Sequence, residues 1–97
     1  MSFVLVVRMK MKEGTEDRVL EIARELAEAS RAEAGCEAYV PCRAADDPSA
    51  LLFYEQYRDQ AAFDEHAASK HFQRLAAGEL FGLMESRERR FWETVVD

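Results

Sequence analysis

The sequence predicts an α+β fold whose elements follow the order β-α-β-β-α-β. The segment 3–11 is rich in Val, Leu and Met, and it ends in alternating apolar and basic residues, which is typical of a strand. The segment 15–34 repeats apolar residues at intervals of three and four, which is typical of an amphipathic helix. Two alternating segments, a second helical region and an aromatic-rich segment follow. This order predicts a ferredoxin-like plait, with helices on one face of an antiparallel sheet.

The first strand is expected at Phe3–Met11, and Glu13 and Gly14 form the turn that follows it. Thr15 is expected to cap the next helix at its start, and Gly35 is expected to end it as the C′ residue. The buried stripe of this helix consists of five apolar residues, Val19, Ile22, Ala23, Leu26 and Ala27.

A second strand is expected at Cys36–Arg43 and a third at Ala50–Arg58, with a turn over Ala44–Ser49 between them. Pro41 cannot donate a ladder hydrogen bond, so the second strand is expected at a sheet edge or beside a bulge. Alternation places Cys36, Ala38, Val40 and Cys42 on one face of the second strand, and Leu51, Phe53, Glu55 and Tyr57 on one face of the third.

Two short helices are expected next, with Asp59 capping the first and Ser69 capping the second. The buried stripe of the first is Ala62, Phe63, His66 and Ala67, so His66 is expected to point inward; that of the second is Phe72, Leu75 and Ala76. Gly78 and Gly82 interrupt the helical pattern, and the last strand is expected at Glu85–Val96.

Composition narrows the function classes. A chain of 97 residues predicts a single domain, 1–97. The net charge of −6 argues against nucleic acid or an anionic membrane as a partner. No segment has the length and apolarity of a membrane span, and the N-terminus lacks the basic region of a signal peptide, so a cytoplasmic location is expected. Cys36 and Cys42 lie too far apart on one strand, about 20 Å, to form a disulfide, and both are expected to be buried.

Proton chemistry near neutral pH is easiest to place at His66 and His71, the two histidines of the chain. His66 is a candidate general base or orienting donor; alternatively it is a core histidine bonded to backbone or to Glu55. Glu55 is a candidate to hold a histidine in one tautomer; alternatively it makes a structural hydrogen bond or an ion pair with Arg8. A metal site is not expected, because no cysteine or suitably spaced carboxylate completes a ligand set with the histidines.

Aromatic residues are candidates to line a substrate pocket, although core packing is their commoner use: Tyr39, Phe53, Tyr57, Phe63, Phe72 and Phe81. The arginines Arg87, Arg89 and Arg90 are expected on a solvated strand face. The sheet face without helices is expected to expose Val4, Leu52, Tyr54 and Trp92. Such a patch predicts a homodimer formed through the sheet face.

Three stretches resemble the antibiotic biosynthesis monooxygenase (ABM) family, and its quinol monooxygenase-like branch in particular. They are Arg8–Gly14, Glu33–Tyr39, and Glu55–Tyr57 followed by Phe63, His66, His71 and Phe72. The resemblance implies a dimeric α+β barrel with a pocket between sheet and helices in each subunit. It also implies that O2 oxidises a small phenolic or quinol-type substrate without flavin, haem, metal or another cofactor. His66 would then be the base or orienting donor, with Glu55 and His71 in support.

The sequence departs from the haem-degrading members of this family. Those relatives carry an Asn near the end of the first strand, a Trp on the first short helix and a His on the next helix. Val7, His66 and Ala76 stand at these positions here, which argues against haem degradation. Two other functions stay open: an isomerase of a small hydroxy-ketone, and a non-catalytic dimeric protein that binds a small molecule.

Overall fold

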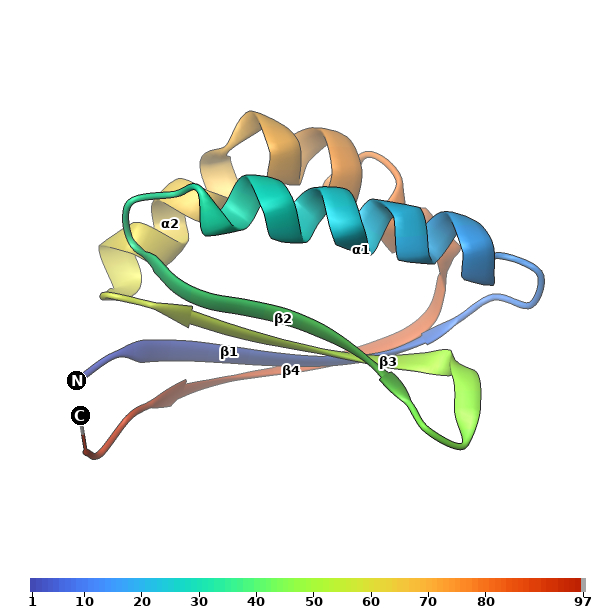
Figure 1. Ribbon diagram of the computed structural model, residues 1–97, viewed down its shortest axis with the longest axis horizontal. Helices are drawn as coiled ribbons and strands as arrows, with labels where there is room; N and C mark the ends of the chain where they lie inside the picture. Colours follow the sequence, from blue (N-terminus) through green and yellow to red (C-terminus); the bar gives the residue numbers. More distant parts are fainter. Residues whose placement is uncertain (97) are drawn as a thin grey trace.

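The computed structural model describes residues 1–96 and arranges them in two layers (Figure 1). One layer is an antiparallel sheet in the order β2-β3-β1-β4, formed by β1 (Phe3–Met11), β2 (Cys36–Ala44), β3 (Asp47–Tyr57) and β4 (Met84–Glu93). The other layer holds α1 (Glu16–Arg31), α2 (Gln60–Ala68), the π-helical turn η1 (Phe72–Ala77) and the 3-10 turn η2 (Leu80–Leu83). The predicted ferredoxin-like α+β fold is confirmed.

Strand β1 lies at the centre of the sheet and sets its register. Val7 pairs with Phe53 on β3 and with Arg89 on β4. Because side chains alternate along a strand, Leu5, Val7, Met9 and Met11 all face the helices, and all four are buried. The same alternation sends Arg8 to the opposite face, so the ion pair considered between Arg8 and Glu55 does not form.

Helix α1 buries the five apolar residues predicted for its inner face, together with Ser30. Its ends differ from the prediction. Thr15 donates its hydroxyl to the carbonyl of Lys12 (2.6 Å) instead of accepting from the first helical turn. The helix ends at Arg31, and Gly35 lies in the following loop with an ordinary negative φ, so its expected role as a left-handed C′ residue is wrong. Gly35 is required for another reason, because a β-carbon there would overlap Ala62 of α2.

The β2–β3 hairpin is tighter than expected, because Ala44 pairs with Asp47 and only residues 45 and 46 lie between the strands. Strand β2 is an edge strand, as Pro41 predicts. A register shift between Cys36 and Ala38 turns Cys36 toward the core, away from the face that it was expected to share. Cys42 is exposed, so its predicted burial is wrong; both thiols are free.

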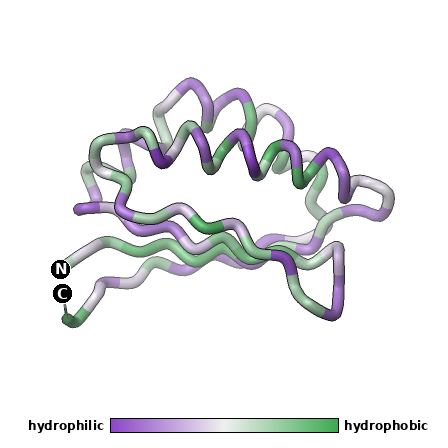
Figure 2. Tube along the Cα trace, viewed as in Figure 1, coloured by the Kyte–Doolittle hydropathy of each residue, from purple (hydrophilic) through white to green (hydrophobic). Residues whose placement is uncertain are grey.

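In the described part of the chain, residues 1–96, no helix covers the outer face of the sheet, although hydrophobic residues continue along its strands (Figure 2). Trp92 is 47% exposed there, and Leu52 and Tyr54 are partly buried, whereas Val4 is only 5% exposed and was wrongly expected at the surface. Val4 pairs with Trp92 on β4 and Gln56 on β3, and these flanking side chains shield it. Strand β4 ends at Glu93, before the expected Val96. Within residues 1–96, no helix is long and apolar enough to cross a membrane.

The close approach of Gly35 to α2 predicts a stability effect. Gly35→Ala should lower the free energy of unfolding by about 1–3 kcal/mol, because the new methyl group overlaps Ala62. Urea denaturation measures this change. Gly82→Ala is the control, since open space surrounds Gly82, and it should change stability little. Adding Ala62→Gly should restore part of the loss; equal stability of Gly35→Ala and the wild type would contradict this packing.

Candidate active site

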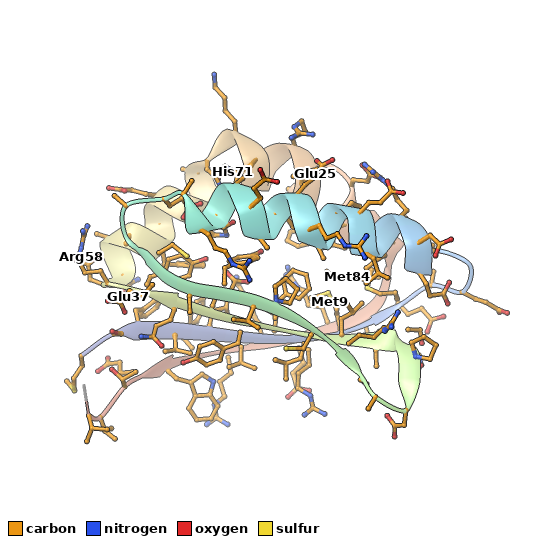
Figure 3. All side chains as sticks on the ribbon, in the orientation of Figure 1. Met9, Glu25, Glu37, Arg58, His71 and Met84 are labelled. Carbon is orange, nitrogen blue, oxygen red and sulfur yellow. The ribbon has the colours of Figure 1, made fainter. Side chains whose placement is uncertain are left out.

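A cavity of about 330 Å³ lies between the inner face of the sheet and the helical layer. Its volume lies in the range of small-molecule sites. Met9 and Met84, two of its lining residues, are visible in the layer between sheet and helices (Figure 3). Most of the lining is apolar or aromatic: Leu5, Val7, Met9, Leu26, Tyr39, Phe53, Phe63, Ala67, Phe72, Ala76, Leu80, Phe81 and Met84. Glu55, Arg87 and Arg89 supply its charged groups.

Glu55 is the one carboxylate among the residues 1–96 that line this cavity. It lies on the inner face of β3, opposite Leu5 of β1, and is 4% exposed. Tyr57 donates its hydroxyl to Glu55 Oε1 at 2.6 Å. Burial raises the pKa of Glu55 to about 7, the hydrogen bond from Tyr57 opposes this rise, and the negative charge of Glu33 adds to it. The carboxyl group can therefore accept or release a proton near neutral pH.

His66 stands behind Glu55 and does not line the cavity. It is 2% exposed and points inward from α2, as predicted. Its Nδ1 lies 2.8 Å from Glu33 Oε2, and its Nε2 lies 3.7 Å from Glu55 Oε1. Burial lowers the pKa of His66, and the hydrogen bond with Glu33 opposes that effect. Because a carboxylate only accepts, a neutral His66 donates from Nδ1 to Glu33, and the free lone pair of Nε2 is directed toward Glu55.

Glu33 was not among the residues selected from the sequence. Its Oε2 also accepts a hydrogen bond from His71 Nε2 at 2.5 Å, so one carboxylate oxygen bonds both histidines. The expectation that no carboxylate completes a ligand set with the histidines is therefore wrong. Glu33 precedes His66 by 33 residues and lies in the loop between α1 and β2, so periodicity within an element could not associate the two. The sequence signal was present only in the Glu33–Tyr39 stretch of the family resemblance.

Two caps hold the histidines at this position, and both were predicted. Asp59 accepts a hydrogen bond from the amide of Ala62 (2.9 Å) and starts α2. The Ser69 hydroxyl donates to the carbonyl of His66 (2.7 Å) and accepts from the amide of Phe72 (3.2 Å). The chain bends at Ser69, and this bend brings His71 to within 5.8 Å of His66, measured between ring centres.

Five of the six selected aromatic residues line the cavity, namely Tyr39, Phe53, Phe63, Phe72 and Phe81. Tyr57 does not: it is completely buried and contacts the site through its hydrogen bond to Glu55. Arg87, Arg89 and Arg90 are exposed on β4, as expected. Arg87 and Arg89 also line the cavity, because β4 pairs them with the cavity residues Met9 and Val7 of β1.

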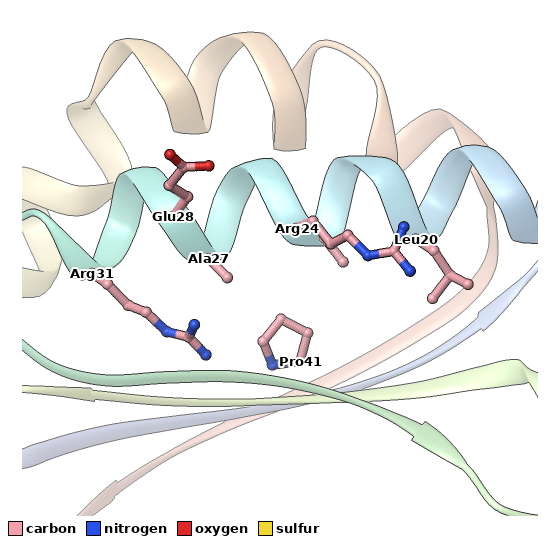
Figure 4. A pocket seen from close by; sticks show the side chains of 7 residues that line it. Leu20, Arg24, Ala27, Glu28, Arg31 and Pro41 are labelled. Atoms are coloured by element: carbon pink, nitrogen blue, oxygen red, sulfur yellow. The ribbon is translucent and has the colours of Figure 1, made fainter.

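A second depression lies on the surface between α1 and β2 (Figure 4). Its volume of about 550 Å³ exceeds that of the cavity, but it is open to solvent. Arg31 of its lining directs its guanidinium to the carbonyl oxygen of Tyr39, at 3.0 and 2.7 Å. Its lining contains neither a histidine nor a buried carboxylate, so the cavity beside Glu55 is the better candidate for proton chemistry.

The sequence model of a family described as "Antibiotic biosynthesis monooxygenase" matches residues 2–78. None of the curated proteins compared is significantly similar in sequence.

Several solved structures share the fold over nearly the whole chain. A crystal structure described as an antibiotic biosynthesis monooxygenase is 29% identical, with a TM-score of 0.89, and the match covers 97% of this chain and 99% of that chain. Protein SO0527 from Shewanella oneidensis is 31% identical, with a TM-score of 0.86, covering 94% of this chain and 88% of that chain. PA3566 from Pseudomonas aeruginosa is 25% identical, with a TM-score of 0.89, covering 98% of this chain and 95% of that chain.

The buried hydrogen bond between Tyr57 and Glu55 predicts a further stability effect. Tyr57→Phe should lower the free energy of unfolding by about 1–3 kcal/mol, because it leaves Glu55 Oε1 buried without its donor. Thermal and urea denaturation measure this loss. Tyr54→Phe is a matched control, since the Tyr54 hydroxyl bonds Gln56 on the outer face, and it should have a smaller effect. Equal losses in the two variants would contradict a special role for the buried bond.

Proposed function

Because the chain belongs to the antibiotic biosynthesis monooxygenase family, we propose that it oxidises a small phenolic or quinol-type substrate with O2 and without a cofactor. The observation that best supports this proposal is the aromatic-lined cavity with the buried carboxyl group of Glu55 at its wall. An aromatic ring matches such a lining in shape and polarity. Its lining is mostly apolar, which strengthens the interaction of a charged intermediate with the few charged groups around it.

In the proposed first step, the Glu55 carboxylate accepts the proton of the substrate hydroxyl. It is the better candidate for the base than His66, because Glu55 lines the cavity and His66 does not. The Nε2 atom of His66, 3.7 Å from Glu55 Oε1, is a second acceptor behind it. His66 is thus a positioning residue that also takes part in holding the proton. His71 does not contact Glu55 or the cavity; it bonds Glu33, which in turn bonds His66.

In the proposed second step, the electron-rich substrate anion reduces O2 directly. A carbon–oxygen bond forms, and the resulting peroxide takes up a proton from Glu55. The carbon that carries the peroxide must also carry a hydrogen. When this hydrogen leaves as a proton and the O–O bond breaks, the carbon becomes a carbonyl and water is released. One oxygen atom enters the product and the other enters water. All four electrons come from the substrate, so the balance needs no external reductant.

We also propose a homodimer formed through the outer face of the sheet. Trp92, Tyr54 and Leu52 lie on this face, and Arg90 stacks over Trp92 at 4.7 Å. Uncovered apolar surface of this kind is typical of an interface between subunits. A two-fold arrangement would cover the face while leaving each cavity on the opposite, helical side of its own sheet.

Oxygen uptake tests the proposed activity. The purified protein, without added metal or flavin, should consume O2 with at least one member of a panel of hydroquinones and anthrone-like phenols. Glu55→Gln should lower kcat by about 100- to 10,000-fold, because it removes the proton acceptor while keeping the size of the side chain. His66→Ala should also lower kcat, since it removes the group behind Glu55.

Glu37→Gln is the matched control. Glu37 is an exposed carboxylate that bonds Ser2 and Gln56 and does not line the cavity, so its replacement should leave oxygen uptake unchanged. Uptake no faster than autoxidation over the whole panel would contradict the monooxygenase proposal and favour an isomerase or a binding protein. Uptake that survives Glu55→Gln would keep the reaction but contradict the assignment of the base.

If the dimer forms through the outer face of the sheet, a charged side chain introduced on that face should weaken the association of the subunits. Trp92→Glu should weaken association by about 2 kcal/mol or more, because a large apolar contact is replaced by a carboxylate. Sedimentation velocity over a range of concentrations measures this. Ala61→Glu, an equally charged change at an exposed site on α2, should leave association unchanged. A monomeric wild type, or equal behaviour of both variants, would rule out the proposed interface.

A further inference from the structure

We propose that Glu33, His66 and His71 bind one divalent transition-metal ion of the Zn²⁺ class beside the cavity. The three residues come from the loop after α1, from α2, and from the start of the helical segment after Ser69. Their potential ligand atoms, two imidazole nitrogens and one carboxylate oxygen, all lie within 4.8 Å of one another. Convergence of three such donors from separate segments is the arrangement that a metal ion requires.

The three donor atoms suit a metal ion of intermediate softness such as Zn²⁺. Two imidazoles and one carboxylate form a three-ligand set that proteins use for Zn²⁺, and water or another small ligand takes the remaining position. Imidazole ligands disfavour Ca²⁺ and Mg²⁺, which prefer all-oxygen sites. The ring nitrogens directed at the carboxylate are His66 Nδ1 and His71 Nε2.

The present contacts leave one polar atom unsatisfied. Both imidazoles bond Glu33 Oε2, while Glu33 Oε1 is buried and meets no hydrogen-bond partner within residues 1–96. A buried oxygen without a partner is costly in a network of hydrogen bonds alone. An ion bound by Glu33 Oε2 and the two imidazoles would replace the two ring protons between the donors, and bidentate binding by Glu33 would also give Oε1 a partner.

Only a small movement is needed. Nitrogen and oxygen ligands lie about 2.0–2.2 Å from a tetrahedral Zn²⁺, so two ligands of one ion are about 3.3–3.6 Å apart. The nitrogen–oxygen distances are now 2.8 and 2.5 Å. Withdrawal of the Glu33 carboxylate by about 1 Å or less would satisfy the two nitrogen–oxygen distances, and Glu33 lies in a loop. The two ring nitrogens, which lie within 4.8 Å of each other, would have to reach a similar separation on the same ion.

The surroundings resemble those of a metal-bound histidine. A ligating imidazole usually directs its other ring N–H to a carboxylate, which fixes its orientation. His66 Nε2 lies 3.7 Å from Glu55 Oε1 and would carry the proton once Nδ1 binds the ion. Solvent can reach the site, because the side chains of His71 and Glu33 are 20% and 18% exposed.

None of the three ligands lines the cavity, so the proposed ion is structural. It would join the loop after α1 to α2 and to the helical segment after Ser69, and it would hold His66 behind Glu55. In the metal-bound protein Nε2 of His66 would be protonated and would face Glu55 Oε1, so Glu55 alone would accept the substrate proton. The metal site is tested by metal binding alone, so its failure is distinguishable from a failure of the proposed oxygen chemistry.

The test is a titration of tag-free protein that has been stripped with a chelator and then dialysed. Zn²⁺ is added in competition with a chromophoric chelator, and Co²⁺ is added separately so that its visible spectrum reports coordination. The wild type should bind one ion per chain, and Zn²⁺ should raise its Tm. Glu33→Gln and His71→Ala should each weaken binding by more than about tenfold, since even the loss of an outer-shell partner costs about that much.

Two control variants should bind as the wild type does. Glu65→Gln removes an exposed carboxylate next to His66, and Cys42→Ser removes the exposed thiol. Circular dichroism measures whether each variant is folded. If His71→Ala does not fold, the binding affinity of Glu33→Gln decides the outcome. Absence of binding by the folded wild type, or wild-type affinity in a folded Glu33→Gln or His71→Ala variant, would overturn the proposed site.

Discussion

The carboxylate of Glu33, shared by two histidines, is the interaction on which the site depends. An imidazole in an apolar layer needs partners for its ring nitrogens, because an unpaired polar group loses its hydration without compensation. His66 is almost completely buried among Tyr39, Tyr57 and Phe72, and Glu33 is the group that its Nδ1 bonds. The same oxygen holds His71. One side chain therefore connects the loop after α1 to α2 and to the segment after Ser69.

Glu33 is connected to the cavity through His66 and Glu55. His66 lies behind Glu55, and Glu55 presents its carboxyl group at a wall that is otherwise mostly aromatic and aliphatic. Burial raises the pKa of Glu55 toward neutrality, and Tyr57 holds one of its oxygens in place. The sheet register then sets which residues surround it, because β1 places Leu5 opposite both Glu55 and Phe91. The contacts of Glu55 with Tyr57 and His66, and the pairing of β1 with β3, therefore stabilise the fold and also set the surroundings of the carboxyl group.

The sequence predicted the parts of this fold that depend on local patterns. Alternation along β1, the apolar stripe of α1 and the caps Asp59 and Ser69 are local, and the structure confirms them. Gly35 shows where local rules fail, because its small size is required by Ala62 of a later helix and not by the end of α1. Glu33 was missed for a similar reason: its partners lie 33 and 38 residues further along the chain, and no periodic pattern connects them. Likewise, Arg87 and Arg89 reach the cavity only through the pairing of β4 with β1.

The most direct test of the account is a crystal structure of the protein with a hydroxyanthraquinone, an aromatic ligand that resembles an oxidised product. We expect the ring system to occupy the cavity among Phe53, Phe63 and Phe72, with one ligand oxygen within hydrogen-bond distance of the Glu55 carboxyl group. The contacts among His66, Glu33 and Glu55 should persist behind it. A ligand bound in the surface depression between α1 and β2, or one whose oxygens all point away from Glu55, would contradict the account.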